Sequence, residues 1–287
     1  MPIAVIVLDF DPLLRLADSL VVRWQTVALV AIVAVGLIAT LLIARREGLR
    51  ADDLLFIAVA AVPGAVLGGR LGYVLLHLDY YDAHKSAIVD PAQGSLELAL
   101  AIVGGTLSSA YVAGLLGAPI GRWLRAATLP LLFVLGAGKL AMVLGGSGQG
   151  MPVDLPWATA YTGAGPWGSL APELPSHPAQ AYEGIAGLAI LAILSLALAG
   201  GAFRRWDGRL FFAALACWAL ARAAIAVTWR DPTVALGLSA GSLVALGVAA
   251  GSAAAFIVLA RRPTRSPAQG PATREVSWPD PEARSRF

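Results

Sequence analysis

Residues 54–78 read LLFIAVAAVPGAVLGGRLGYVLLHL, an apolar run that holds a single charged residue, Arg70, between glycines. The run is long enough to cross a bilayer as a helix, since about 20 residues at about 1.5 Å each span the hydrocarbon core. A guanidinium stays protonated and is costly to place in lipid, so we expect Arg70 to face a polar cavity between helices. The stretch therefore predicts a helical membrane protein with a polar site inside it.

The composition of the whole chain supports this prediction. Of the 287 residues, 58% are hydrophobic and only 14% are charged, and the mean hydropathy is +0.74, unlike a soluble domain. The formal net charge is +3, but the arginines gather at the ends of apolar runs, so we expect no nucleic-acid partner. The single cysteine, Cys217, excludes an intrachain disulfide and a zinc site of the usual spacing. We expect no metal and no cofactor.

Seven apolar runs are long enough to cross a bilayer. We therefore predict an all-α integral membrane protein, a bundle of seven transmembrane helices within residues 23–262. The predicted spans are 25–44, 54–78, 95–116, 126–146, 179–199, 210–228 and 234–259.

The two ends of the chain are predicted to lie outside this bundle. Residues 1–22 carry several charges among apolar residues, which predicts an interfacial segment with a short helix at about 11–20. Residues 263–287 are rich in Pro, Ser and Arg and have little to bury, which predicts a disordered cytoplasmic tail.

The orientation follows from the basic residues of the connections. One alternating set of loops, together with the tail, holds 14 Lys and Arg residues, and the other set holds four. Cytoplasmic loops retain positive charge, so the count predicts an outside amino terminus and a cytoplasmic carboxyl terminus. The long connection at 147–178 has no Lys or Arg, and we expect it on the outer face.

Three basic residues lie inside the predicted spans. Counted inward from the outer end at about 1.5 Å per residue, Arg70 lies ~12 Å deep, Lys139 ~10 Å and Arg222 ~9 Å. Glu183 lies ~7 Å deep by the same count, and Glu97 is predicted near the surface. We predict that the three cations converge on a pocket for the phosphate of an anionic lipid. Snorkelling to the interface, or a purely structural Arg70–Glu183 pair, would use the same residues.

A second group of polar residues opens the fifth span. His177, Gln180 and Glu183 follow one another at single helical turns, so one face of the helix could present them to the pocket. Tyr182 lies beside them. Helix-start chemistry explains Pro178 but not the full set, so we predict a role for this group in the site.

These residues, in this order, resemble the prolipoprotein diacylglyceryl transferases, seven-span enzymes of the bacterial inner membrane. The resemblance covers roughly residues 23–232. Its most specific parts are GGRLGY at 68–73, DLPWA at 154–158, HPAQAYE at 177–183 and the sixth span with Arg222, which ends in WRDP at 229–232.

The resemblance implies transfer of a diacylglyceryl group from phosphatidylglycerol to the thiol of a lipobox cysteine in a prolipoprotein signal peptide. The predicted location is therefore the bacterial cytoplasmic membrane. The residues implied for catalysis are His177, Glu183 and Lys139, those for the lipid phosphate are Arg70, Lys139 and Arg222, and those for the pocket are Gly69, Gly104, Gly105, Gly146, Gln180 and Tyr182.

The chain departs from the family at several polar positions. Where the family has a histidine before a glycine pair, this chain has Val103. Where the fourth-span signature has an arginine, two asparagines and a glutamate, it has Lys139, Met142, Gly145 and Ser147, and Gln25 and Ala226 stand for a tyrosine and a glutamate. Two functions therefore stay open: a divergent transferase, or a lipid- or lipoprotein-binding protein that has lost the chemistry. A transporter fits less well, because the sequence shows no internal repeat.

Overall fold

The computed structural model describes residues 5–17, 19–90 and 94–262. Within these residues, seven helices are long and apolar enough to cross a membrane, which confirms the predicted number of spans and the mainly helical membrane fold. They are α1 (Trp24–Arg46), α2 (Ala51–Leu76), α4 (Leu98–Leu115), α5 (Ile120–Ala141), α6 (Ala179–Ala199), α7 (Arg209–Ile225) and α8 (Ala240–Arg261). The predicted tail at 263–287 lies outside the described residues.

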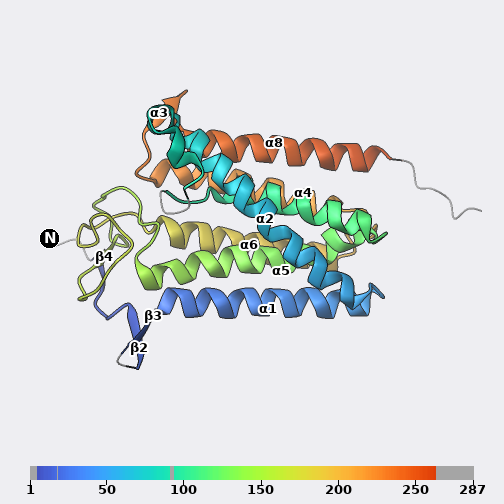
Figure 1. Cartoon of the computed structure of the whole chain (residues 1–287), viewed down its shortest axis with the longest axis horizontal. Helices are drawn as coiled ribbons and strands as arrows, with labels where there is room; N and C mark the ends of the chain where they lie inside the picture. The colour runs from blue at the N-terminus through green and yellow to red at the C-terminus, as the bar shows by residue number, and fades with distance from the viewer. Residues whose placement is uncertain (1–4, 18, 91–93, 263–287) are drawn as a thin grey trace, which may run out of the picture.

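The connections gather at the two ends of the bundle (Figure 1). One end, which we term the cap end, carries the amino-terminal strands, α3 (Leu78–Ala83) and the long connection between α5 and α6. The opposite end, termed the tail end, carries the α1–α2, α4–α5 and α6–α7 connections and the end of α8. The arginine-rich connections therefore share one end of the bundle.

The helices α2 and α4 pack with their backbones in contact. A Cβ on Gly104 of α4 would overlap the carbonyl of Gly64 and lie 3.1 Å from the Cα of Gly68, both on α2. Small residues at a crossing let helices approach closely in a membrane. The glycines of GGRLGY and of the Gly104–Gly105 pair therefore allow α2 and α4 to pack closely.

The amino-terminal segment contains strands and not the predicted helix at 11–20. The strands β2 (Leu13–Ala17) and β3 (Leu20–Arg23) form an antiparallel hairpin that leads directly into α1. Pro12 precedes the hairpin, and its carbonyl accepts a hydrogen bond of 3.0 Å from the amide of Trp24, the first residue of α1. The apolar, partly β-branched sequence pairs with itself across the turn, so the prediction of a helix was wrong.

The cap is completed by two further strands and three single turns of 3₁₀ helix. β1 (Ile6–Leu8) pairs in parallel with β4 (Thr159–Tyr161), which ties the start of the chain to the α5–α6 connection. The 3₁₀ turns are η1 (Lys85–Ile88), η2 (Met142–Gly145) and η3 (Ala226–Thr228).

The last span starts later than predicted. The residues from 233 to 239 form a hairpin of β5 (Thr233–Ala235) and β6 (Leu238–Ser239). Its two turn residues, Leu236 and Gly237, both have positive φ, as tight two-residue hairpins require. The hydroxyl of Ser239 then caps α8 by accepting the amide hydrogen of Ser242 at 3.2 Å.

Candidate functional site

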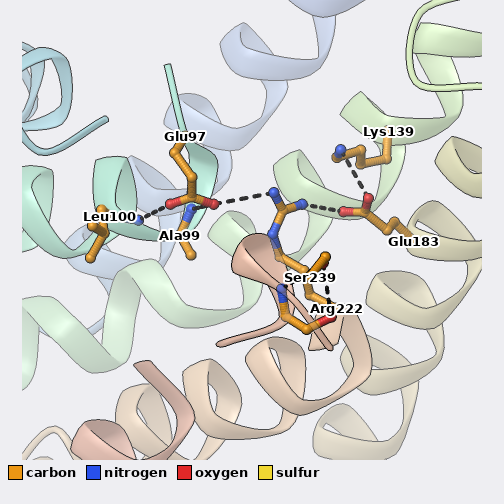
Figure 2. Close-up of polar contacts among 8 residues, drawn as sticks. Glu97, Ala99, Leu100, Lys139, Glu183, Arg222 and Ser239 are labelled. Carbon is orange, nitrogen blue, oxygen red and sulfur yellow. Dashed lines mark hydrogen bonds and ion pairs between the residues drawn. The ribbon is translucent and has the colours of Figure 1, made fainter. Parts of the chain in front are cut away.

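Four ionisable side chains from four helix segments meet near the cap end, and we term them the ionic cluster (Figure 2). Arg222 of α7 lies in the centre. It donates from Nη1 to Oε2 of Glu183 at 2.6 Å and from Nη2 to Oε1 of Glu97 at 3.2 Å. Lys139 of α5 donates to Oε1 of Glu183 at 3.2 Å. Of the three cations predicted to converge, Lys139 and Arg222 therefore meet, and they meet at Glu183.

Glu97 occupies the point where α4 begins. Its two carboxylate oxygens accept the amide hydrogens of Ala99 and Leu100 at 2.9 and 2.7 Å, so it caps the helix while it pairs with Arg222. Gly69 and Gly72 of α2 make room for it: a Cβ on Gly72 would lie 2.8 Å from that of Glu97. Glu97 is only 5% exposed, so it is buried in the protein although it lies at the end of its span.

The charges of the ionic cluster balance, with two cations against two carboxylates. The side chains of Glu183 and Arg222 are 4% and 8% exposed, and that of Lys139 is 15% exposed. Donor capacity is left over, because Nε of Arg222 is buried without a hydrogen-bond partner and an ammonium carries three donors. An anion that enters could therefore be held by both cations if it replaces one carboxylate.

Arg70 has a different environment. Its Nε donates to the carbonyl of Ile88 at 2.7 Å, and its Nη2 donates to the carbonyls of Ala87 and Asp90 at 2.5 and 3.1 Å. Its guanidinium also lies over the ring of Tyr81, 5.4 Å from the centroid. The ion pairs among the described residues do not place Arg70 with Lys139 and Arg222. At the same depth in the bundle, it fastens η1 to α2.

Gln180 is buried and faces the cap. Its amide donates at 3.0 Å to the hydroxyl of Tyr161 in β4, and its Oε1 has no hydrogen-bond partner. Burial raises the pKa of Tyr161 to about 12, although the bond from Gln180 acts in the opposite direction. The first turn of α6 thus divides its polar residues, with Glu183 in the ionic cluster and Gln180 against the cap.

His177 also contacts the cap. Its Nδ1 shares a hydrogen bond of 3.3 Å with the hydroxyl of Tyr182, which accepts another of 2.8 Å from the indole of Trp157. The contacts found for His177 among the described residues link it to the cap and to Tyr182, not to the ionic cluster.

The predicted pocket glycines have separate places. Gly104 lies in the α2–α4 crossing and Gly105 faces an apolar cavity. Gly146 has a φ of 71° and ends η2 against the ring of Trp167. Val103 packs against the apolar core shared by α5, α7 and α8. The Gly104–Gly105 pair therefore does not leave open space next to Val103.

Comparison with known proteins assigns the chain to a family. A family model described as prolipoprotein diacylglyceryl transferase matches residues 12–258, which include the whole ionic cluster. The chain belongs to this family.

Curated relatives carry the name phosphatidylglycerol–prolipoprotein diacylglyceryl transferase. The protein of Geobacter sulfurreducens is 29% identical over 240 residues, which cover 80% of this chain and 86% of the relative. That of Nitrobacter hamburgensis is 28% identical over 288 residues, which cover 93% and 95%. That of Rhodopseudomonas palustris is 27% identical over 260 residues, which cover 82% of each.

In this member of the transferase family, the α7–α8 connection also holds the cap in place. Arg230 donates from Nε to the carbonyl of Gly150 at 2.7 Å and from Nη2 to Gln149 and Ser176 at 3.4 and 3.3 Å. From the sequence, Arg230 was predicted only to be one of the four basic residues of the outer connections. Its position beside Trp229, in the WRDP motif that carries the family resemblance, was the available signal.

An apolar cavity of about 440 Å³ lies between α1, α2, α4 and α5. Leu98, which directly follows Glu97, lines one part of it, and Trp123, toward the tail end, lines another. Apolar cavities next to a few convergent polar groups are the usual form of a ligand site. In this family member the helix that Glu97 caps therefore also lines a space suited to a hydrocarbon chain.

Proposed function

We propose that this multi-pass membrane protein transfers the diacylglyceryl group of phosphatidylglycerol to the thiol of a lipobox cysteine in a prolipoprotein signal peptide. The observation that carries the proposal is the ionic cluster. In a chain that matches the transferase family over residues 12–258, two cations with unused donors pair with Glu97 and Glu183. Leu98, which follows Glu97, lines an apolar cavity. The named relatives act on the same two substrates.

The phosphate of the lipid would bind between Arg222 and Lys139. Its entry replaces carboxylate contacts of 2.6 and 3.2 Å with contacts to phosphate oxygens, and Nε of Arg222 gains an acceptor. Charge-assisted hydrogen bonds of this kind are the strong ones. They also stabilise the negative charge that grows on the leaving group.

The thiolate sulfur of the peptide attacks the glycerol carbon that carries the phosphate ester. A carbon–sulfur bond forms, the carbon–oxygen bond breaks, and glycerol phosphate leaves with the electron pair. The thiol must first lose its proton. We assign the acceptor role to Glu183, because it is the carboxylate of the ionic cluster that both cations contact and that the entering phosphate would release. His177 would then order the cap.

The acyl chains need an apolar space next to the phosphate. The cavity of about 440 Å³ offers that space, and its lining starts at Leu98, beside Glu97. A hydrocarbon chain gains free energy there in proportion to the apolar area removed from water.

Complementation of a strain depleted of its own transferase tests the proposal. We expect the wild type to restore growth and lipoprotein processing, and Glu183→Gln to abolish both. A Val103→His, Lys139→Arg double variant restores the family's residues at two of the positions where this chain differs, and it is tested in the same strain. If neither the wild type nor this variant processes lipoproteins while both still bind phosphatidylglycerol, the protein is a lipid-binding relative and the enzyme proposal is wrong.

We further propose that the cap end faces outward from the bacterial cytoplasmic membrane. The 14-to-four distribution of basic residues supports this orientation. A cysteine placed in the 147–178 connection should react with an impermeant thiol reagent in whole cells. If a cysteine placed at position 204 reacted with this reagent instead, the tail end would face outward and the proposed orientation would be wrong.

A further inference from the structure

The guanidinium of Arg222 contacts two carboxylates and two aromatic rings. Its two terminal nitrogens bind Glu183 and Glu97. Its Cζ lies over the rings of Trp229 and Trp218, 4.5 and 5.7 Å from their centroids. The closer ring meets the distance at which a cation and an aromatic face attract each other strongly. Trp229 is therefore the principal neighbour of Arg222 that is not a carboxylate.

The backbone around Trp229 is fixed by hydrogen bonds. Its amide donates to the carbonyl of Ala226 at 3.1 Å, and the carbonyl of Thr228 before it accepts the amide hydrogen of Met151 at 2.8 Å. Arg230 after it is fastened to the cap. The segment that carries Trp229 is thus bound on both sides, so the ring has little freedom to leave Arg222.

The first turn of α8 lies against the same ring. A Cβ on Gly241 would lie 2.7 Å from Cζ3 of Trp229, so no larger residue fits while the ring stays in place. That turn is itself fixed, because the hydroxyl of Ser242 donates to the carbonyl of Ala223, the neighbour of Arg222, at 3.3 Å. Gly241 and Arg222 therefore both lie against the indole.

We propose that Trp229 is a positioning residue that fixes the plane of the Arg222 guanidinium and excludes water from its face. The catalytic part of this inference rests on the proposed function, in which Arg222 holds the lipid phosphate. A planar guanidinium binds phosphate through a fixed fork of donors. Rotation of the guanidinium plane would misalign its donors relative to the phosphate and to the two carboxylates. The indole that lies against the guanidinium prevents this rotation.

The test compares Trp229 with a matched cation–π pair at the tail end, where Cζ of Arg125 lies 4.4 Å from the ring of Trp206. Transfer from phosphatidylglycerol to a lipobox peptide is measured on the full-length protein in lipid nanodiscs. We expect Trp229→Leu to lower kcat/KM for the lipid about tenfold, the order of a desolvated cation–π contact. Trp229→Phe should recover most of it, and Trp206→Leu should leave it unchanged.

A chemical readout separates this inference from the proposed function. Phenylglyoxal modifies exposed arginines, and peptide mapping gives the fraction of Arg222 modified. We expect modification of Arg222 to be slow in the wild type and in Trp206→Leu, and fast in Trp229→Leu. Should Trp229→Leu fail to fold, Gly241→Ala, which displaces the ring, carries the same expectation.

Unchanged modification of Arg222 in the variant that folds would overturn the inference. So would a loss of activity that Trp229→Phe does not recover. If the wild type transfers no lipid, the proposed function fails, and the modification of Arg222 still decides the role of Trp229.

Discussion

Arg222 and Arg70, both predicted inside the spans, differ in what surrounds them. Arg222 joins two buried carboxylates from α4 and α6, and its Nε has no hydrogen-bond partner among the described residues. Arg70 donates to the carbonyls of Ala87, Ile88 and Asp90 and lies over the ring of Tyr81. The described polar contacts of Arg222 are to carboxylates, whereas those of Arg70 are to backbone carbonyls of one loop.

Two arginines at the tail end can be compared with Arg70 and Arg222. Arg122 donates to the carbonyl of Glu47, and Arg125 donates to that of Phe203, so each ties a connection to α5. Arg70 resembles these two residues more than it resembles Arg222. In this protein the arginines bonded to carbonyls thus join connections to helices, and Arg222, bonded to buried carboxylates, is the one that we propose binds a ligand.

The largest effect is expected at the ionic cluster. Arg222→Ala leaves Glu97 and Glu183 buried without their shared cation, and removing one partner of a buried pair costs about 3–5 kcal/mol. We expect a large fall in the free energy of unfolding, measured in detergent, together with loss of transfer. Arg222→Lys should recover much of the stability but not the transfer, because a point charge replaces the fork. Full transfer by Arg222→Lys would contradict this.

A smaller effect is expected at Arg70. Arg70→Ala removes three described hydrogen bonds from a charged donor. The freed carbonyls belong to Ala87, which is buried, and to Ile88 and Asp90, which are partly exposed, so water can replace part of the loss. We expect a cost of about 2 kcal/mol in stability and an affinity for phosphatidylglycerol close to that of the wild type. Equilibrium binding to lipid nanodiscs measures this. If Arg70→Ala binds the lipid as weakly as Arg222→Lys does, the distinction between the two arginines is wrong.

The smallest effect is expected at Arg122. Its Nη2 makes one described bond, to the carbonyl of Glu47, at the end of the bundle away from the ionic cluster. We expect Arg122→Ala to lower stability by about 1 kcal/mol and to leave transfer unchanged. Thermal unfolding and the transfer assay, run on the same preparation, measure both. A marked loss of transfer would mean that the tail end takes part in the reaction.

The sequence predicts the seven spans well because length and apolar composition alone determine whether a helix can cross a bilayer. It fails at 11–20 and at 233–239, where short apolar segments pair as hairpins. Such segments have no decisive period, and their structure depends on a partner strand and on turn residues such as Leu236 and Gly237.

The depth of Lys139, Arg222, Arg70 and Glu97 in the membrane stays a prediction from residue counts along the spans. The direction that each side chain faces depends on how the helices cross, and the crossing of α2 and α4 is set by contacts of Gly64, Gly68 and Gly104. Residue counts along a span give no information on that direction.

The close packing of α2 against α4 has a mechanical consequence. The two helices contact each other along their length, whereas α2 touches α1 only slightly and α4 touches α5 only slightly. Helices α2 and α4 therefore form one closely packed pair, the other spans form a larger group, and the apolar cavity lies along the weakly packed boundary between them. The Glu97–Arg222 ion pair crosses this boundary. Loss of that ion pair, as in Arg222→Ala, would therefore weaken the bundle along the side where the cavity lies.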